Sequence, residues 1–372
     1  MKFIDRTDQI ASLGDALSGA SLVALDTEAA GYHRYHDRLC VVQLSTRQET
    51  YVIDALAADI GPLGSLFASV ANETVLHDAD FDLRLLGRDF GIGVANLFDT
   101  KVAAQFLGET TLGLAGLAEK HLGVRLDKKH QRADWARRPL TAELLEYAAE
   151  DTRHLPSLRD VLRDQLIETD RLRWAEEEFR LREAMESAPS ENGDGWMRIK
   201  NTRDLTARQL AALRELYEWR DGVARGRDVA PFRVLANEAL VAIARGMPGS
   251  AALLAGVGGM SPVVVARHGR DLVAAVERAQ ALGEEDLPVR KRGPRRPAPD
   301  PSFETLVDRL RIVRDKVADE LGLERGFLMP RDQLEEVARR KPRDARELRE
   351  VADMRDWQVE AIGSALLGAL AR

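Results

Sequence analysis

Two acidic residues stand at the end of a short apolar run near the start of the chain. The run covers residues 22–25 and is followed by Asp26 and Glu28. Because alternate residues of a strand point to the same face, the two carboxylates would lie side by side. Like charges held together cost free energy unless a positive charge lies between them, and hard cations such as Mg²⁺ prefer oxygen ligands. The pattern indicates a cation site, with solvated acids at a strand end as the alternative.

Two further acids are candidates to complete this site. Asp82 follows the apolar segment 74–77. Asp151 lies four residues after Tyr147 in a helical pattern, so these two side chains share a helix face. Four convergent carboxylates suit two-metal phosphodiester hydrolysis, in which two cations about 4 Å apart activate the attacking water and stabilise the leaving oxygen. Carboxylate ligands favour Mg²⁺ or Mn²⁺.

The segments that carry these residues alternate between strand and helix patterns. Short apolar runs predict strands at residues 22–25, 39–44, 51–54 and 74–77. Helical spacing predicts helices at residues 62–70, 97–107, 112–122 and from 141 onward. Thr141 is expected to cap the last of these, and Asp78 or Asp80 to cap the helix that contains Asp82. The alternation predicts an α/β domain.

Length and composition exclude several classes of protein. A chain of 372 residues has room for two or three domains. The net charge of −7 gives no global positive field, so nucleic acid would have to bind through local basic patches or cations. Cys40 is the only cysteine, which excludes an intramolecular disulfide and a cysteine zinc site; we interpret it as a small core residue. Neither a signal peptide nor an apolar run long enough to span a membrane is expected.

The C-terminal half repeats itself at a constant offset. When the sequence is shifted by 94 positions, the separation of Arg220 from Arg314, the two copies align without a gap, and Pro248 falls on Pro342. Self-similarity of this kind signals a duplicated helical unit. The stretch 188–195 is rich in residues that break helices and indicates a domain boundary before the first copy.

Two basic segments are possible contacts for phosphate. One covers residues 128–140, where Trp135 is expected to pack in the core and Arg138 either to contact phosphate or to pair with a carboxylate. The other is a proline-rich linker at residues 283–301, which either touches phosphate or is a solvated spacer.

Three motifs resemble those of the DEDD superfamily of 3′→5′ exonucleases. They are Asp26-Thr-Glu28, the segment from His77 to Asp82, and Tyr147-Ala-Ala-Glu-Asp151. The Tyr-x-x-x-Asp spacing resembles the tyrosine subclass. Segment 128–140 and the doubled tail are similar to ribonuclease D, whose C-terminal repeats are HRDC (helicase and RNase D C-terminal) domains.

The resemblance implies a fold and a domain organisation. The expected fold is an α/β ribonuclease-H-like exonuclease domain, with a mixed sheet and flanking helices, followed by two all-α HRDC helical bundles. The implied ranges are 1–187 for the exonuclease domain, 196–282 for the first HRDC domain, 283–301 for the basic linker and 302–372 for the second HRDC domain.

The resemblance also implies roles for the acidic residues and the tyrosine. Asp26, Glu28 and Asp151 would hold the metal that binds the attacking water. Asp26 would bridge to a second metal, with Asp82 supporting it directly or through water. Tyr147 would orient the nucleophilic water through its hydroxyl, because a phenol with a pKa near 10 is a poor base but a good hydrogen-bond partner.

Substrate contacts follow in the same way. Tyr32 and His33 would stack on or clamp the terminal nucleotides, with a mobile loop as the alternative. The full set of expected substrate-binding residues is Thr27, Tyr32, His33, Lys128, Gln131 and Arg138. His77 is expected to be structural.

The implied function is removal of nucleotides from RNA 3′ ends, typically those of tRNA precursors, with release of nucleoside 5′-monophosphates. Two divalent metal ions, Mg²⁺ or Mn²⁺, are the implied cofactors, and the expected protein is a cytoplasmic monomer that binds RNA and no membrane. The alternatives are a DNA 3′→5′ exonuclease of repair and a non-catalytic nucleic-acid-binding protein. A helicase is excluded by the absence of a P-loop motif.

Overall fold

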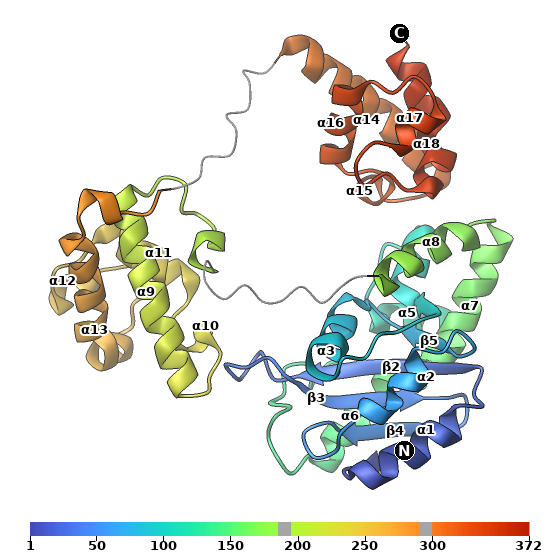
Figure 1. Ribbon diagram of the computed structural model, residues 1–372, viewed down its shortest axis with the longest axis horizontal. Helices are drawn as coiled ribbons and strands as arrows, with labels where there is room; N and C mark the ends of the chain where they lie inside the picture. Colours follow the sequence, from blue (N-terminus) through green and yellow to red (C-terminus); the bar gives the residue numbers. More distant parts are fainter. Residues whose placement is uncertain (185–194, 290–299, 372) are drawn as a thin grey trace. The chain divides into compact units, whose positions relative to one another are not determined.

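The computed structural model describes residues 1–184, 195–289 and 300–371 of the chain (Figure 1). Two compact units share the chain. Unit 1 consists of Met1–Glu28, Leu39–Ser187 and Arg296–Arg372, and unit 2 of Ala29–Arg38 and Ala188–Arg295. Unit 1 thus combines the α/β domain with the second C-terminal repeat, and unit 2 combines the first repeat with the short segment that follows Glu28. The stretch 188–195 and the linker 283–301 fall largely outside the described residues.

A six-stranded mixed sheet forms the centre of the α/β domain. Its strands are β1 (Lys2–Ile4), β2 (Leu22–Ala29), β3 (Leu39–Ser45), β4 (Thr50–Asp54), β5 (Glu73–Leu76) and β6 (Leu97–Asp99), in the order β1-β4-β3-β2-β5-β6. β3 and β4 are antiparallel, whereas β1 pairs with β4, and β5 with β2 and β6, in parallel. All residues of β3 and β4 are buried, including Cys40, which confirms their assignment as core strands.

The α/β domain also contains helices, several of which pack on the sheet. They are α1 (Thr7–Leu17), the 3₁₀ turn η1 (Gly61–Leu63), α2 (Gly64–Phe67), α3 (Asp80–Phe90), α4 (Thr100–Phe106), α5 (Leu114–Leu122), α6 (Ala142–Arg153), α7 (Leu155–Glu168) and α8 (Leu172–Glu183). α6 packs on β3 and β4, and α7 packs on α4, α5 and β5. The four predicted strands and the helix that begins after Thr141 are confirmed, and β1 was not predicted.

Two local predictions are wrong, and one residue explains both. The predicted helix 97–107 begins only at Thr100, because residues 97–99 form β6 and the carboxylate of Asp99 caps α4 by accepting from the backbone N–H of Lys101 (2.8 Å). Neither Asp78 nor Asp80 caps α3. Asp99 instead accepts from the backbone N–H groups of Asp78 (3.1 Å) and Ala79 (3.0 Å), so it ties the starts of both helices together.

The two C-terminal repeats have the same succession of helices. The first contains η2 (Gly195–Arg198), α9 (Ala207–Gly226), α10 (Pro231–Val234), α11 (Asn237–Gly246), α12 (Ala251–Ala255), α13 (Pro262–Ala281) and η3 (Glu284–Asp286). The second contains α14 (Pro301–Leu321), α15 (Arg325–Leu328), α16 (Arg331–Arg340), α17 (Ala345–Arg349) and α18 (Asp356–Leu370). The apolar faces of α9, α11 and α13 enclose the core of the first repeat.

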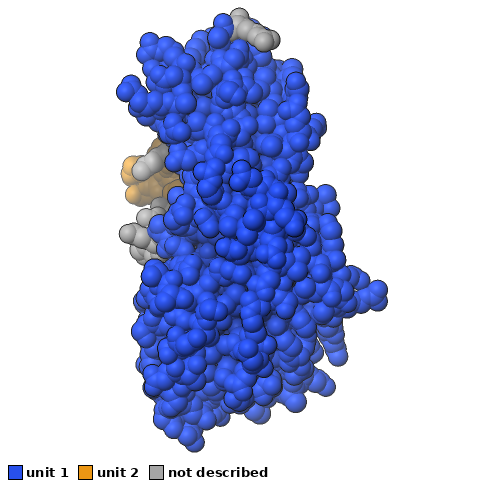
Figure 2. Space-filling model, turned by 90° about the vertical axis from the view of Figure 1, so that its right-hand side faces the viewer, with its two compact units in different colours: residues 1–28, 39–187, 296–372 blue, residues 29–38, 188–295 orange. Residues whose placement is uncertain are grey.

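Within unit 1, the second repeat contacts the α/β domain through aromatic side chains. The ring of Trp357, on α18, lies 4.9 Å from that of Phe106 and 5.9 Å from that of Trp174, measured between centroids. Phe327 on α15 lies 4.9 Å from Phe106. The indole N–H of Trp357 donates to Glu178 at 2.9 Å. These contacts join the second repeat to the α/β domain within unit 1, which is drawn in blue in Figure 2.

Within the described ranges, none of the helices combines the length and the apolar content needed to cross a lipid bilayer.

Candidate active site

Three of the predicted acidic residues come together at the end of β2 and on α6. One carboxylate oxygen from each of Asp26, Glu28 and Asp151 lies within 4.8 Å of the others. All three side chains are partly exposed, so a substrate could reach them. Asp26 and Glu28 are alternate residues of β2, and Asp151 comes from a helix more than a hundred residues further along the chain.

α6 is held against the sheet at the turn that carries Asp151. At its start, the hydroxyl of Thr141 accepts from the backbone N–H of Leu144 at 3.3 Å, as predicted for the cap. Near its end, the hydroxyls of Thr152 and Ser45 are hydrogen-bonded at 2.8 Å, and both residues are buried. Because Thr152 follows Asp151, this bond to β3 sets the position of the carboxylate relative to the sheet.

Asp82 approaches the same group from α3. It is buried, with 5% of its surface exposed, and its Oδ1 accepts a hydrogen bond from the hydroxyl of Thr27. Thr27 lies between Asp26 and Glu28, so the hydrogen bond links α3 directly to the acidic strand end. Asp82 lies outside the tight group of three but close enough for its charge to act on Glu28.

Burial and mutual repulsion raise the pKa of all four carboxyl groups. Burial, followed by the charge of Asp151, raises the pKa of Asp26 to about 8. Burial, followed by Glu150, raises the pKa of Asp151 to about 7. Burial, followed by the charge of Asp26, raises the pKa of Glu28 and that of Asp82 well above their ordinary values. Bare anions are unfavourable here, so the all-oxygen donor set fits a hard divalent cation.

Comparison with known proteins assigns this geometry to a family. A 3′–5′ exonuclease family model matches residues 1–167, and the HRDC domain model matches residues 209–276 and 303–370. The sequence is 36% identical to Escherichia coli ribonuclease D over 292 residues, which is 77% of each chain. It is 31% identical to Nitrobacter hamburgensis ribonuclease D over 372 residues, covering 99% of this chain and 94% of that protein. The chain belongs to the ribonuclease D family.

Solved structures agree with the family assignment. The crystal structure of Escherichia coli RNase D matches with a TM-score of 0.71 and 30% identity, covering 100% of this chain and 98% of that one. A protein from Bifidobacterium adolescentis matches with a TM-score of 0.83 and 25% identity, covering 100% and 97%. The predicted fold class is confirmed. This member of the ribonuclease D family is a 3′→5′ exoribonuclease, and RNA is its substrate.

Tyr147 lies one helical turn before Asp151 on α6. Its ring centroid is 5.7 Å from that of His130 and 6.1 Å from that of Trp135. Burial and the neighbouring carboxylates raise the pKa of its hydroxyl above the ordinary value, so the phenol is neutral at physiological pH. Trp135 is buried, with 2% of its surface exposed, which confirms its predicted packing role.

All hydrogen-bond donors of the Arg138 guanidinium have acceptors within the α/β domain. Its Nε and Nη2 donate to the two carboxylate oxygens of Asp54 at 2.5 and 2.6 Å, and Nη2 also donates to the carbonyl of Cys40 at 3.1 Å. Nη1 donates to the carbonyls of Trp135 (2.5 Å) and Arg137 (3.0 Å). A guanidinium has five N–H donors, and all five have acceptors here. The structure therefore favours the structural alternative for Arg138 over a contact with phosphate.

The other predicted substrate residues lie in three different surroundings. Lys128 and Gln131 are exposed on the segment before α6. Thr27 is buried and bonded to Asp82. Tyr32 and His33 belong to unit 2, where they contact the first HRDC repeat.

Two further residues, His77 and Asp99, make hydrogen bonds near the active site. His77 Nδ1 is hydrogen-bonded to the hydroxyl of Thr100 at 2.9 Å, which confirms the predicted structural role of this histidine. Asp99, whose capping bonds position α3 and hence Asp82, was missed by the sequence analysis. The signal was present, because an Asp that ends an apolar run is a frequent helix cap.

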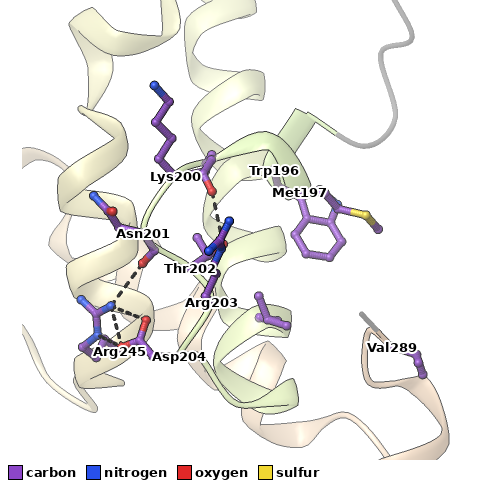
Figure 3. A pocket seen from close by; sticks show the side chains of 11 residues that line it. Trp196, Met197, Lys200, Asn201, Thr202, Arg203, Asp204, Arg245 and Val289 are labelled. Carbon is purple, nitrogen blue, oxygen red and sulfur yellow. Dashed lines mark hydrogen bonds and ion pairs between the residues drawn. The ribbon is translucent and has the colours of Figure 1, made fainter. Parts of the chain in front are cut away.

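A pocket of about 1070 Å³ lies elsewhere, in the first HRDC repeat (Figure 3). Its walls include Trp196, Met197 and Val289, with Arg245 paired to Asp204 at 2.9 Å on one side. None of the acidic residues described above lines it. The acidic residues of the active site therefore do not belong to this pocket.

Proposed function

We propose that the protein shortens RNA from its 3′ end by two-metal phosphodiester hydrolysis and releases nucleoside 5′-monophosphates. The observation that supports this proposal is the convergence of Asp26, Glu28 and Asp151, with Asp82 hydrogen-bonded to the residue between the first two. Repelling carboxylates with raised pKa values are held in place by bonds from three elements of the fold.

Asp26, Glu28 and Asp151 would hold one divalent ion, and Asp26 with Asp82 would hold a second. When bound, such ions would lower the pKa of a coordinated water and stabilise the negative charge on the leaving oxygen. Mg²⁺ and Mn²⁺ both suit an all-carboxylate site.

Tyr147 would orient the attacking water. A neutral phenol can both donate and accept a hydrogen bond, and the raised pKa of its hydroxyl keeps it from acting as a general base. Its ring is positioned by Trp135 and His130, so the hydroxyl has a limited range of directions. If the hydroxyl of Tyr147 only orients the water, its removal should reduce the rate of hydrolysis moderately.

The proposed substrates are structured RNAs with a free 3′ end, among them tRNA precursors, handled by a cytoplasmic monomer. Support comes from the relatives: the Escherichia coli protein is described as an exoribonuclease involved in structured RNA processing. The proposed domain ranges remain 1–187, 196–282, 283–301 and 302–372, and the proposed substrate contacts remain Thr27, Tyr32, His33, Lys128 and Gln131.

The test is a timed digestion of tRNA precursor labelled at its 3′ or 5′ end, with Mg²⁺, Mn²⁺ or EDTA. We expect early release of the 3′ label as mononucleotide, progressive shortening of the 5′-labelled RNA, and no reaction in EDTA. Asp26→Asn should reduce the rate by at least about a thousandfold, because one ligand of both ions is weakened. Asp164→Asn, which changes an exposed acid on α7, is the matched control and should retain full activity.

Three results would contradict the proposal. They are full activity of Asp26→Asn, undiminished activity in EDTA, and faster digestion of a matched DNA strand than of RNA. The last result would favour the DNA exonuclease alternative.

A further inference from the structure

Two aromatic side chains from distant parts of the sequence form an exposed pair in unit 2. Tyr32 lies in the segment Ala29–Arg38, and Phe232 lies on α10 of the first HRDC repeat. Their ring centroids are 5.4 Å apart and their planes are inclined at 52°. Large aromatic residues are usually buried, yet these two have 42% and 49% of their surface exposed. We call Tyr32, Phe232 and the adjacent Arg233 the aromatic platform.

Positive and polar groups lie directly beside the two rings. The guanidinium carbon of Arg233 is 5.1 Å from the centroid of Tyr32 and 5.9 Å from that of Phe232. The ring of His33 is 5.2 Å from that of Tyr32, and its Nε2 is 3.4 Å from Nη2 of Arg233. Exposed ring faces combined with a guanidinium are the usual elements of a surface that binds single-stranded nucleic acid.

The first HRDC repeat holds the backbone of the platform in place. Nε of Arg233 donates to the carbonyl of Tyr32 at 2.9 Å, and the backbone N–H of Ala230 donates to the carbonyl of His33 at 3.2 Å. These bonds favour an ordered segment over the mobile-loop alternative. A surface that is ordered before binding loses less conformational entropy when the ligand arrives.

Tyr35 adds a second attachment three residues further along. Its hydroxyl is hydrogen-bonded to Asp221 at 2.8 Å and accepts from Nη2 of Arg225 at 3.0 Å. Its backbone N–H donates to Asp228 at 3.3 Å. The segment is thus bound to α9 and to the turn before α10.

Chain length limits how far the platform can be from the catalytic strand. Tyr32 is four residues after Glu28, and an extended chain spans at most about 3.5 Å per residue, so the two Cα atoms are no more than about 14 Å apart. This distance is comparable with the length of a few nucleotides of an extended single strand. A base bound at the platform would therefore belong to the last few nucleotides of an RNA whose 3′ end is at the carboxylates.

We propose that the aromatic platform is a stacking subsite for a nucleobase in the single-stranded 3′ segment of the RNA. Tyr32 and Phe232 supply the ring faces, and Arg233 supplies positive charge to the neighbouring phosphate. The inference rests on the proposed function, since it assumes an RNA 3′ end at the carboxylates. It assigns to the first HRDC repeat, through Phe232 and Arg233, a direct contact with the substrate.

The test uses full-length protein carrying Asp26→Asn, which we expect to bind RNA without degrading it. The RNAs are hairpins with a single-stranded 3′ tail, each carrying the fluorescent base 2-aminopurine at one position between the first and the sixth nucleotide from the end. Stacking on an aromatic ring quenches this fluorophore. We expect strong quenching at one or two adjacent positions within the last four nucleotides.

Substitutions of Phe232 separate stacking from packing. Phe232→Ala should abolish the quenching and weaken RNA binding about 5- to 30-fold, which is the effect of losing one stacked base. Phe232→Leu keeps apolar contact with Tyr32 and should have nearly the same effect, whereas Phe232→Trp should retain both quenching and affinity. Val263→Ala and Leu253→Ala are matched controls, because both change exposed apolar residues of the same repeat and should change neither measurement.

The inference is overturned if Phe232→Ala binds and quenches like the parent protein. It is also overturned if Phe232→Leu retains the quenching, since the residue would then serve only to hold the segment. These outcomes are distinct from failure of the proposed function, which would appear as absence of nuclease activity in the protein with Asp26 intact.

Discussion

The two C-terminal repeats have the same internal construction. Arg220 and Arg314, 94 positions apart, are both buried, and their Nη1 atoms donate to the carbonyls of the equivalent residues Leu235 (2.9 Å) and Met329 (2.6 Å). The helices that follow both end in a left-handed residue, with φ of 46° at Met247 and 48° at Lys341. The same backbone is therefore built twice from a sequence that agrees only at scattered positions.

The surfaces of the two repeats differ at the same helix ends. Trp357 of the second repeat is 2% exposed against the α/β domain, whereas its equivalent Val263 is 65% exposed. Phe327 packs on Phe106, whereas its equivalent Arg233 binds the segment that contains Tyr32. The second repeat is thus a structural part of the catalytic unit, whereas the first repeat contributes Phe232 and Arg233 to the aromatic platform.

The largest effect is expected from removing the contact that only the second repeat makes. Trp357→Ala should lower the free energy of unfolding of unit 1 by about 3–5 kcal/mol, because a large buried ring is replaced by a cavity. Val263→Ala, at the equivalent position, should change stability by no more than about 0.5 kcal/mol. Differential scanning calorimetry of both variants measures this contrast. Equal effects would show that the two surfaces are not used differently.

The next effect tests what the repeats share. Arg220→Met and Arg314→Met each leave a buried carbonyl without its donor and should each cost about 2–3 kcal/mol in denaturant unfolding. Each guanidinium makes a further side-chain hydrogen bond, from Arg220 to the amide oxygen of Asn237 at 2.8 Å and from Arg314 to the carboxylate of Asp315 at 2.6 Å. The cost should be larger for Arg314, because its partner is charged. A neutral effect at one position only would show that the matching hydrogen bonds do not have matching roles.

A smaller effect concerns a buried polar pair that only the second repeat contains. Gln333 and Gln358 donate to each other at 3.0 and 3.1 Å, while the first repeat has Ala239 and Val264 at these positions. Gln333→Ala should cost about 1–2 kcal/mol, since the amide of Gln358 loses a buried partner. The double variant Gln333→Ala/Gln358→Val, which copies the first repeat, should recover part of this loss. A double variant less stable than the single one would contradict this reasoning.

The smallest effect separates the two units by their response to pH. In EDTA, the raised pKa values of Asp26 (about 8) and Asp151 (about 7) mean that the folded protein binds more protons than the unfolded chain between about pH 4 and pH 8. Stability should therefore fall as pH rises through this window, lowering the melting temperature of unit 1 by a few degrees. Partial exposure of these carboxylates keeps the effect small.

Two comparisons check the origin of this pH dependence. Asp26→Asn should flatten it, and saturating Mg²⁺ should reverse it by stabilising the ionised form. The melting of unit 2, which has no such acidic group among its described residues, should not follow the same curve. A metal-free protein that becomes more stable between pH 5 and pH 8 would contradict the raised pKa values.

Local sequence patterns determined much of this molecule. The apolar runs before Asp26 and after Arg38 predicted buried strands, Thr141 predicted the start of α6, and the constant offset predicted the second repeat, whose family match begins at residue 303, 94 residues after the first at 209. These features depend on residue types at short spacing, because strand alternation, helical periodicity and capping are set by neighbours in the chain. Spacing also brought out the pair Asp26 and Glu28 and the position of Asp151 relative to Tyr147, whereas Asp82 was distinguished from Asp78 and Asp80 by the resemblance to the exonuclease motifs.

Tertiary structure alone decided which distant partners these residues meet. The guanidinium of Arg138 has all its donors occupied by Asp54 and nearby carbonyls, and Asp99 replaces the two neighbouring acids as the cap near α3. The segment 29–38 belongs with the first repeat, while the second repeat belongs with the catalytic domain. Such choices depend on the packing of different elements of the fold, because several acids or aromatic rings are available as partners and only the fold determines which of them lies within hydrogen-bonding distance.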